Sequence, residues 1–456
     1  MEIITIYGKA GCGKSTKLSE IIEKDRSKYV VLAPTNSAVE NIFNICLLRT
    51  NESESGNVNE LKRDRFKTIY SYFRIDYNNN IVLGAVEMME TIYIDEFSLI
   101  DKFLFKKCLN DMRMKKCGRL ILCGDVMQLN AVYKMKQYIS FDKVKRWNKL
   151  YERIMLKVNE VKQMKNMNQT NLMKNVNQTE SVENSNENQN CRQFVSPNVL
   201  EHLHLNIFGT KAIRKGTLIN LTVNKRSNSE IKQILTNIYS KNISFNYQFV
   251  SFFDIPKLIL NENYVFIASK YSILQKVYDY IYTTYWCNKN NKLDIITIEQ
   301  HISYSSGFKN LYLYSGMKII VCDTDEQKKY INGEELIFTG NIECNKLKCY
   351  SESRKEIVYI HKIKEVEMSH SEEFYPICPN FLISIHKSQG RTIENVIFCI
   401  DELFDMSMLY TGITRAKNKL MFFSEEKNEI KRVELLIKNA YVDDFKQLDL
   451  ICNNMN

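Results

Sequence analysis

Short apolar runs alternate with amphipathic stretches through the first part of the chain. The runs Ile3–Tyr7, Tyr29–Ala33, Thr91–Ile94 and Leu120–Cys123 have the length and composition of buried strands. The stretches Ser15–Glu23, Ser37–Leu47 and Asp101–Met114 have helical spacing. Strands separated by helices predict an α/β fold with a parallel sheet, which binds ligands at the carboxyl edge of its strands.

A second α/β region starts near Asn198. Its predicted elements are strand Tyr264–Ala268, helix Ser272–Tyr282, strand Phe381–Ile385, strand Val396–Ile400, a helix through Tyr410–Ala416 and strand Lys419–Phe423. Between the two halves of this region lie β-type runs at Lys318–Cys322, Glu335–Phe338 and Ile357–Ile360. This order predicts a small β-rich domain inserted into the second α/β domain.

The polar segment from Asn159 to Asn190 is rich in Asn, Gln, Ser and Lys and has no sustained periodicity. Such a segment buries too little apolar surface to offset the entropy of ordering, so we expect disorder there. The resulting domains are residues 1–158, a linker at 159–196, a second α/β domain at 197–287 with 380–445, an insertion at 288–379 and a tail at 446–456.

Composition narrows the class of protein. With 44% hydrophobic and 25% charged residues, the 456-residue chain has the usage of soluble proteins. No apolar stretch approaches the ~20 residues of a membrane span, and no signal segment precedes the first strand. The 13 cysteines form no CxxC pair and suit a reducing, intracellular compartment. Cys191, His202 and His204 lack zinc-site spacing, so we interpret them as structural or surface residues.

The net charge of +10 is unevenly distributed. Between Ala131 and Lys174, eleven Lys or Arg stand against three acidic residues, with aromatic residues such as Tyr133 and Trp147 among them. This pattern fits a polyanion whose bases stack on the aromatic rings. It fits equally a solvated helix face whose aromatic side chains point to the core.

A glycine-rich loop follows the first strand and opens into the first predicted helix. Its sequence is Gly8-Lys9-Ala10-Gly11-Cys12-Gly13-Lys14-Ser15-Thr16. Glycine lets successive backbone N–H groups point at a phosphate, and the helix N-terminus adds partial positive charge. This pattern predicts that Lys14 reaches the β- and γ-phosphates of a nucleotide and that Ser15 binds Mg²⁺.

Further candidates stand at the ends of later strands. Asp95 and Glu96 end the strand Thr91–Ile94, where Asp95 can hold Mg²⁺ and Glu96 can act as general base. Gln128, after the next strand, can sense the γ-phosphate and the attacking water. Arg415 is either an arginine finger from the second domain or a surface residue.

The order of these motifs resembles superfamily 1 helicases, and its details resemble the Pif, RecD and Dda group of DNA helicases. The segments that carry the resemblance, besides those above, are Ala33–Ile42, Thr68–Phe73, Leu221–Arg226, Leu311–Glu334, Ser384–Thr392 and Tyr410–Lys417. Tyr70 replaces the histidine of the family's Thr-Ile-His-Ser motif. The resemblance covers nearly the whole chain apart from the polar segment.

The resemblance implies two RecA-like motor domains with ATP and Mg²⁺ in the cleft between them, and an SH3-like insertion. It implies catalytic roles for Lys14, Asp95, Glu96, Gln128, Arg226 and Arg415, metal binding by Ser15 and Asp95, and nucleotide contacts from the loop, Gln389 and Gly390. It implies strand contacts from Pro34, Thr35, Thr68, Tyr70, His386, Lys387 and Gln389. The implied partners are single-stranded DNA and tailed duplex DNA, bound by a monomeric motor that moves 5′→3′ in replication, recombination or repair.

Several alternatives stay open at this stage. The chain has no room for the glutamine that reads adenine upstream of the loop in the family, so its nucleotide preference is open. Only a short hairpin within residues 74–84 is available to split a duplex. Tyr70 either stacks on a base or packs against Phe73, and His386 is either a coupling residue or a buried structural one. A viral-type superfamily 1 RNA helicase and a nucleic-acid-binding module without motor activity are the competing functions.

Overall fold

The computed structural model describes residues 1–52, 62–75, 89–100, 102–125, 128, 216–239, 248–287, 294–300, 307–325, 329–364, 373–403 and 406–439. All of them belong to one compact unit built from residues 1–131 and 202–440. The basic stretch 131–174, the linker 159–196, the tail 446–456 and all but the start of the hairpin 74–84 lie outside the described residues. No helix in the described ranges is long and apolar enough to cross a membrane.

The first lobe is a six-stranded parallel sheet with the order β3-β2-β4-β5-β1-β6. Its strands are β1 (Glu2–Gly8), β2 (Tyr29–Ala33), β3 (Phe66–Thr68), β4 (Thr91–Ile94), β5 (Arg119–Gly124) and β6 (Thr217–Leu221). Its helices are α1 (Lys14–Lys24), α2 (Asn36–Glu52), α3 (Ile69–Phe73) and α4 (Lys102–Met114). Because every pair is parallel, the carboxyl ends of these strands share one edge, where the predicted phosphate loop and acidic pair stand.

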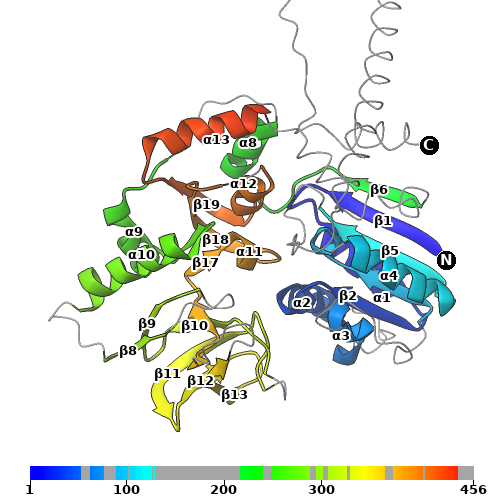
Figure 1. Cartoon of the computed structure of the whole chain (residues 1–456). Coiled ribbons are helices and arrows are strands. Elements are labelled where there is room, and N and C mark those ends of the chain that lie inside the picture. The colour runs from blue at the N-terminus through cyan, green and yellow to red at the C-terminus, as the bar shows by residue number, and fades with distance from the viewer. Residues whose placement is uncertain are drawn as a thin grey trace, which may run out of the picture. The chain divides into compact units, whose positions relative to one another are not determined.

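Strand β6 corrects one predicted boundary. Residues 197–287 are expected in the second domain, yet Thr217–Leu221 pairs in parallel with β1, from Ile4↔Thr217 to Gly8↔Leu221. Figure 1 shows the green β6 beside the dark blue β1. Pairing between segments about two hundred residues apart leaves no local signal in the sequence, which explains the error.

The second lobe is a four-stranded parallel sheet with the order β17-β7-β18-β19. Its strands are β17 (Leu382–Ser384), β7 (Tyr264–Ala268), β18 (Ile393–Cys399) and β19 (Ala416–Phe423). Its helices are α8 (Ser229–Tyr239), α9 (Ile255–Glu262), α10 (Tyr271–Ile281), α11 (Ile385–Ser388), α12 (Met406–Ile413) and α13 (Lys427–Asn439). The helix predicted through Tyr410–Ala416 ends at Ile413, and Ala416 already begins β19. The α/β class with two parallel sheets is confirmed.

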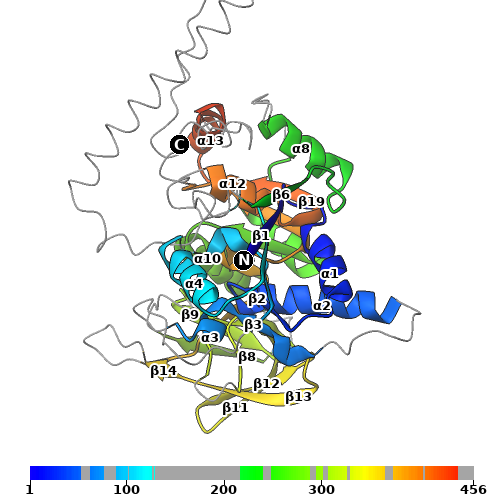
Figure 2. The same ribbon diagram turned by 90° about the vertical axis from the view of Figure 1, so that its right-hand side faces the viewer.

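The insertion within residues 288–379 is rich in β-structure, as predicted. Its main sheet is antiparallel with the order β13-β12-β11-β10-β16. These strands are β10 (Lys318–Val321), β11 (Glu335–Glu343), β12 (Lys346–Ser351), β13 (Glu356–His361) and β16 (Ile377–Pro379). Two further pairs are β8 (Ile295–Glu299) with β9 (Asn310–Tyr314), and β14 (Ile363–Lys364) with β15 (Glu373–Phe374). Figure 2 shows β11, β12 and β13 grouped in yellow. Its SH3-like character stays a prediction.

The insertion and the second lobe share one hydrophobic core. The buried ring of Tyr278 in α10 meets Phe308 and Tyr312 edge-on, with ring centroids 5.6 Å and 5.1 Å away. The Tyr278 hydroxyl also donates a hydrogen bond to the carbonyl of Tyr312 at 2.6 Å. Buried aromatic pairs add specific geometry to the gain from burial, so they hold the insertion against the second lobe.

Candidate active site

The phosphate loop has the geometry that anion binding requires. Gly11 and Gly13 have φ angles of 76° and 77°, a left-handed conformation that is accessible to glycine without strain. Gly13 stands directly before α1, so the N–H groups of the first helical turn point into the loop. A loop of this kind at a helix N-terminus is suited to the phosphates of a nucleotide.

Lys14 is held above the loop by backbone carbonyl groups. Its Nζ donates hydrogen bonds to the carbonyl oxygens of Gly8 and Lys9, both at 2.9 Å. The same ammonium group lies 3.8 Å from Oδ2 of Asp125, which is buried at the end of β5. Lys14 therefore stands at the mouth of the loop with a carboxylate within ion-pair distance.

Ser15 and Asp95 meet as the predicted metal pair. The Ser15 hydroxyl donates to Oδ2 of Asp95 at 2.9 Å. Burial, and next the neighbouring Glu96 carboxylate, raise the pKa of Asp95 above its ordinary value. Glu96 has a φ of 50°, a strained value for a residue with a side chain, and its Oε2 is buried with no hydrogen-bond partner among the described residues. A hydroxyl and two carboxylates supply the oxygen ligands that Mg²⁺ prefers, so these residues fit the ion.

Asp125 connects several groups of the site. It accepts a hydrogen bond from the Tyr410 hydroxyl at 2.8 Å, and Nε2 of Gln128 lies 3.5 Å from the same oxygen. The Tyr410 hydroxyl in turn accepts a hydrogen bond from the backbone N–H of Ala10 at 2.7 Å. Tyr410 lies on α12 of the second lobe, whereas Ala10 and Asp125 belong to the first. Oε1 of Gln128 is buried and has no hydrogen-bond partner in the described part of the chain.

Arg226 lies beside the phosphate loop. The backbone N–H of Lys225 donates to the carbonyl of Gly11 at 2.7 Å. A Cβ atom added to Gly11 would stand 2.4 Å from Oδ1 of Asn224 and 3.0 Å from Cβ of Arg226. The segment after β6 therefore touches the loop directly, and its contact leaves room only for glycine at position 11.

Arg415 is buried, so its interpretation as a surface residue is wrong. The side chain is 1% exposed, and its guanidinium group donates to the carbonyls of Thr411 at 3.1 Å and Arg391 at 3.3 Å. Desolvation lowers the pKa of Arg415 to about 10. The charge of Glu96 raises the pKa of this guanidinium group, and the charge of Arg226 lowers it.

The residues predicted to hold a nucleic-acid strand stand at helix starts. Thr35 follows Pro34 after β2, and its hydroxyl accepts the N–H of Ala38 at 3.2 Å. Thr68 caps α3 in the same way through the N–H of Ser71 at 3.1 Å. Tyr70 is 40% exposed.

Phe73 has an aromatic partner in Tyr72, which packs edge-on against it with ring centroids 5.0 Å apart. The exposed ring of Tyr70 is compatible with stacking on a base, and that role stays a prediction.

The helix α11 presents His386 and Lys387 differently. His386 is exposed, so its interpretation as a buried structural histidine is wrong. Lys387 points into the insertion, where its Nζ lies 2.6 Å from Sγ of Cys322 and 4.0 Å from Sγ of Cys378. This orientation differs from the predicted strand contact, because buried thiols of β16 and of the segment after β10 surround the ammonium group.

Gln389 and Gly390 follow α11. Gln389 is buried, and Gly390 has a φ of 76°. A Cβ atom on Gly390 would lie 3.7 Å from Cβ of Ala38 at the start of α2. The structure thus brings Gly390 next to the first lobe, while its predicted nucleotide contact stays a prediction.

Sequence reasoning missed Asp125 and Tyr410. Tyr410 begins the segment Tyr410–Lys417 that carries the resemblance, and Asp125 lies three residues before the predicted Gln128. Their contact joins residues 285 positions apart, so spacing alone gave no signal for it.

Comparisons with known proteins agree with this geometry. The AAA domain family matches residues 1–134, and the UvrD-like helicase C-terminal domain matches residues 380–423. The ATP-dependent DNA helicase Pif1 of Campylobacter jejuni is 23% identical over 458 residues, covering 91% of this chain and 87% of that protein. The chain is similar to helicases of the Pif and RecD type.

Further similarities agree with that relationship. The RecBCD enzyme subunit RecD of Buchnera aphidicola is 23% identical over 476 residues, with 94% of this chain and 72% of that protein covered. The fold is similar to a Pif1 helicase from Bacteroides in complex with ADP-AlF3 and ssDNA, with a TM-score of 0.56 and 18% identity. That likeness covers 98% of this chain and 92% of the Bacteroides chain, and it agrees with two RecA-like domains.

Proposed function

We propose that this chain is an ATP-dependent DNA helicase that moves 5′→3′ along single-stranded DNA. One observation carries the proposal: the Tyr410 hydroxyl of the second lobe bonds both Ala10 of the phosphate loop and Asp125 of the first lobe. A nucleotide in this loop would therefore contact a site completed by both lobes. Hydrolysis at such a site couples to lobe movement. The names of the Pif1 and RecD relatives support the assignment.

The residues divide the chemistry among them. Lys14 neutralises the β- and γ-phosphates, and the loop N–H groups orient them. Glu96, whose Oε2 has no hydrogen-bond partner among the described residues, accepts the proton of the water that attacks the γ-phosphorus. Gln128 orients that water, and Arg226 and Arg415 stabilise the charge that develops as the bond to the β-phosphate breaks. When bound, Mg²⁺ supplies charge neutralisation, and Ser15 and Asp95 are the residues that would hold it.

Nucleic acid binds along the helix starts that carry Thr35, Thr68 and Tyr70, with His386 exposed on α11. Aromatic stacking contributes about 1–3 kcal/mol per base and tolerates every base. Binding that follows the phosphate backbone of a single strand weakens steeply with salt. A binding affinity that does not change between low and high salt would contradict this part of the proposal.

Strand displacement tests the proposal directly. The substrates are duplexes with a 5′ or a 3′ single-stranded tail, each with and without ATP, and the expected result is unwinding of the 5′-tailed duplex with ATP only. Unwinding of the 3′-tailed duplex alone would overturn the polarity. ATPase stimulation by single-stranded RNA but not by DNA would favour a viral-type RNA helicase instead.

Lys14→Ala is the variant that tests the site. It is expected to abolish hydrolysis while single-strand binding survives, because the ammonium group contacts phosphate and not the strand. Lys17→Ala on the same helix is the matched control, since Lys17 pairs with Glu20 on the surface at 2.9 Å. Turnover by Lys14→Ala at the wild-type rate would contradict the site assignment.

A further inference from the structure

Tyr410 lies on the second lobe and contacts the carboxylate next to Lys14, the residue predicted to bind phosphate. The phenol is buried, and its hydroxyl uses both hydrogen-bonding capacities, accepting from Ala10 and donating to Oδ2 of Asp125. Both partners belong to the first lobe. The link therefore exists only while α12 of the second lobe stays against the phosphate loop.

Asp125 is the group that responds to this link. Its side chain is 1% exposed, so its carboxylate depends on donors from the protein. The same oxygen that accepts from Tyr410 at 2.8 Å lies 3.8 Å from the Lys14 ammonium group. A buried carboxylate that loses one hydrogen bond attracts the nearest cation more strongly, because the surrounding dielectric is low.

Lys14 has two competing sets of partners. In the structure it donates to the carbonyls of Gly8 and Lys9 and stays outside hydrogen-bond distance of Asp125. Phosphate binding requires this ammonium group to face the loop. A closer, hydrogen-bonded contact with Asp125 would hold Lys14 away from phosphate and would oppose nucleotide binding.

We propose that Tyr410 is a positioning residue through which the second lobe sets the nucleotide affinity of the first. With the lobes together, the Tyr410 hydroxyl donates a hydrogen bond to the Asp125 carboxylate, and Lys14 can turn to phosphate. When the lobes separate, Asp125 loses the hydroxyl and captures Lys14, so the bound nucleotide product is released. This inference rests on the proposed function, because it describes how the same site exchanges nucleotide.

The test is a set of dissociation constants for ADP, measured on the full chain by calorimetry. Tyr410→Phe keeps the ring and removes the hydroxyl, and it is expected to weaken ADP binding about tenfold, the equivalent of roughly 1.4 kcal/mol. Adding Asp125→Asn to that variant removes the competing charge. The double variant is expected to bind ADP within about twofold of the wild type.

Tyr93→Phe is the matched control. Tyr93 is also a buried tyrosine that donates to an aspartate, Asp25, at 2.6 Å, but neither residue belongs to the nucleotide site. It loses the same kind of hydrogen bond and should bind ADP as the wild type does. Thermal unfolding of both tyrosine variants shows whether each is folded.

The outcomes separate this inference from the proposed function. Wild-type affinity in Tyr410→Phe, or a double variant as weak as Tyr410→Phe, would overturn the inference. Asp125→Asn alone is expected to bind ADP at least as tightly as the wild type, and weaker binding would overturn it too. A wild-type chain that neither binds ADP nor hydrolyses ATP would instead overturn the proposed function.

Discussion

Gly333 of the insertion lies against Ser37 at the start of α2. A Cβ atom added to Gly333 would stand 3.4 Å from Cβ of Ser37 and 3.6 Å from its backbone nitrogen. Arg391, just after α11, donates to the Gly333 carbonyl at 3.3 Å and to the Glu335 carboxylate at 2.9 Å. The turn of the insertion that contains Gly333 therefore contacts both the first and the second lobe. Its contact with the first lobe lies at the start of α2, which is predicted to bind the nucleic-acid strand.

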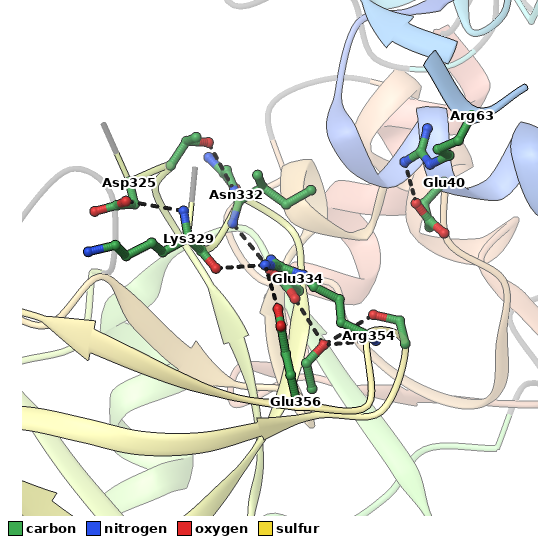
Figure 3. Close-up of polar contacts among 12 residues, drawn as sticks. Glu40, Arg63, Asp325, Lys329, Asn332, Glu334, Arg354 and Glu356 are labelled. Atoms are coloured by element: carbon green, nitrogen blue, oxygen red, sulfur yellow. Dashed lines mark hydrogen bonds and ion pairs between the residues drawn. The ribbon is translucent and has the colours of Figure 1, made fainter. Parts of the chain in front are cut away.

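The turn that carries Gly333 is held by polar contacts within the insertion. Figure 3 shows Arg354 between Glu334 and Glu356, with Asn332 close by. Arg354 also donates to the carbonyl of Lys329 at 2.7 Å, and the N–H of Asn332 donates to Thr324 at 3.0 Å. These bonds order the turn before any strand binds, so Gly333 meets α2 in one defined position.

A large side chain at Gly333 should therefore impair coupling to the strand. Gly333→Leu is expected to lower DNA-stimulated ATPase activity several-fold, because the new side chain displaces the start of α2. Gly316→Leu is the matched control. Gly316 has a φ of 90°, close to the 89° of Gly333, but among the described residues no atom lies within 4 Å of a Cβ added to it. Both variants should lose about 1–2 kcal/mol of stability to backbone strain. Equal stimulation in the two variants would show that the contact with Ser37 has no role in activity.

The two predicted arginine fingers should differ in how much each contributes to the stability of the fold. Arg226 is exposed, whereas Arg415 is 1% exposed and donates to several backbone carbonyls. Arg226→Ala is expected to lower kcat at least tenfold without changing the melting temperature. Arg415→Ala should lower both, because it leaves buried carbonyls unsatisfied at about 1–3 kcal/mol each. ATPase assays and calorimetry on both variants decide this, and an unchanged melting temperature in Arg415→Ala would contradict the burial argument.

The lysine and thiols around α11 should make stability depend on pH. A hydrogen bond from the Cys322 thiol, and also the charges of Lys387 and Arg391, lower the pKa of the Cys378 thiol to about 6. Cys378 and Cys322 raise the pKa of Lys387. Lys387 therefore stays charged at neutral pH and does not contribute to the pH dependence of the free energy of unfolding. Tyr271, whose ring centroid lies 5.7 Å from the Lys387 ammonium group, stays neutral because burial raises its pKa.

The sign follows from the difference between the folded and unfolded thiol. Between pH ~6 and the ordinary thiol pKa of ~8.5, the unfolded chain binds a proton that the folded chain has lost, so stability rises with pH. The free energy of unfolding rises by at most about 1.4 kcal/mol per pH unit. This rise comes from the coupled titration of the two thiols, Cys322 and Cys378. Denaturant unfolding of the wild type from pH 6 to 8.5 should show this rise, and Cys378→Ser should remove it. The same slope in Cys378→Ser would exclude the thiol pair as its source.

The sequence by itself determined what depends on neighbouring residues. Strands β2 and β7 begin and end at the predicted residues, Tyr29–Ala33 and Tyr264–Ala268, because buried parallel strands are short continuous apolar runs. The phosphate loop follows from glycines at fixed offsets before a helix, and Ser15 meets Asp95 because both follow strands of one parallel sheet. These features rest on backbone conformation, periodicity and strand direction, which a local segment carries.

Only the tertiary structure decided which distant groups meet. It moved β6 into the first sheet, buried Arg415, turned Lys387 toward two thiols and joined Tyr410 to Asp125. A side chain with a charge or a hydroxyl has several possible partners, and the partner is set by packing between segments hundreds of residues apart. Periodicity reports whether a residue faces a core, but it contains no information on which other segment supplies that core.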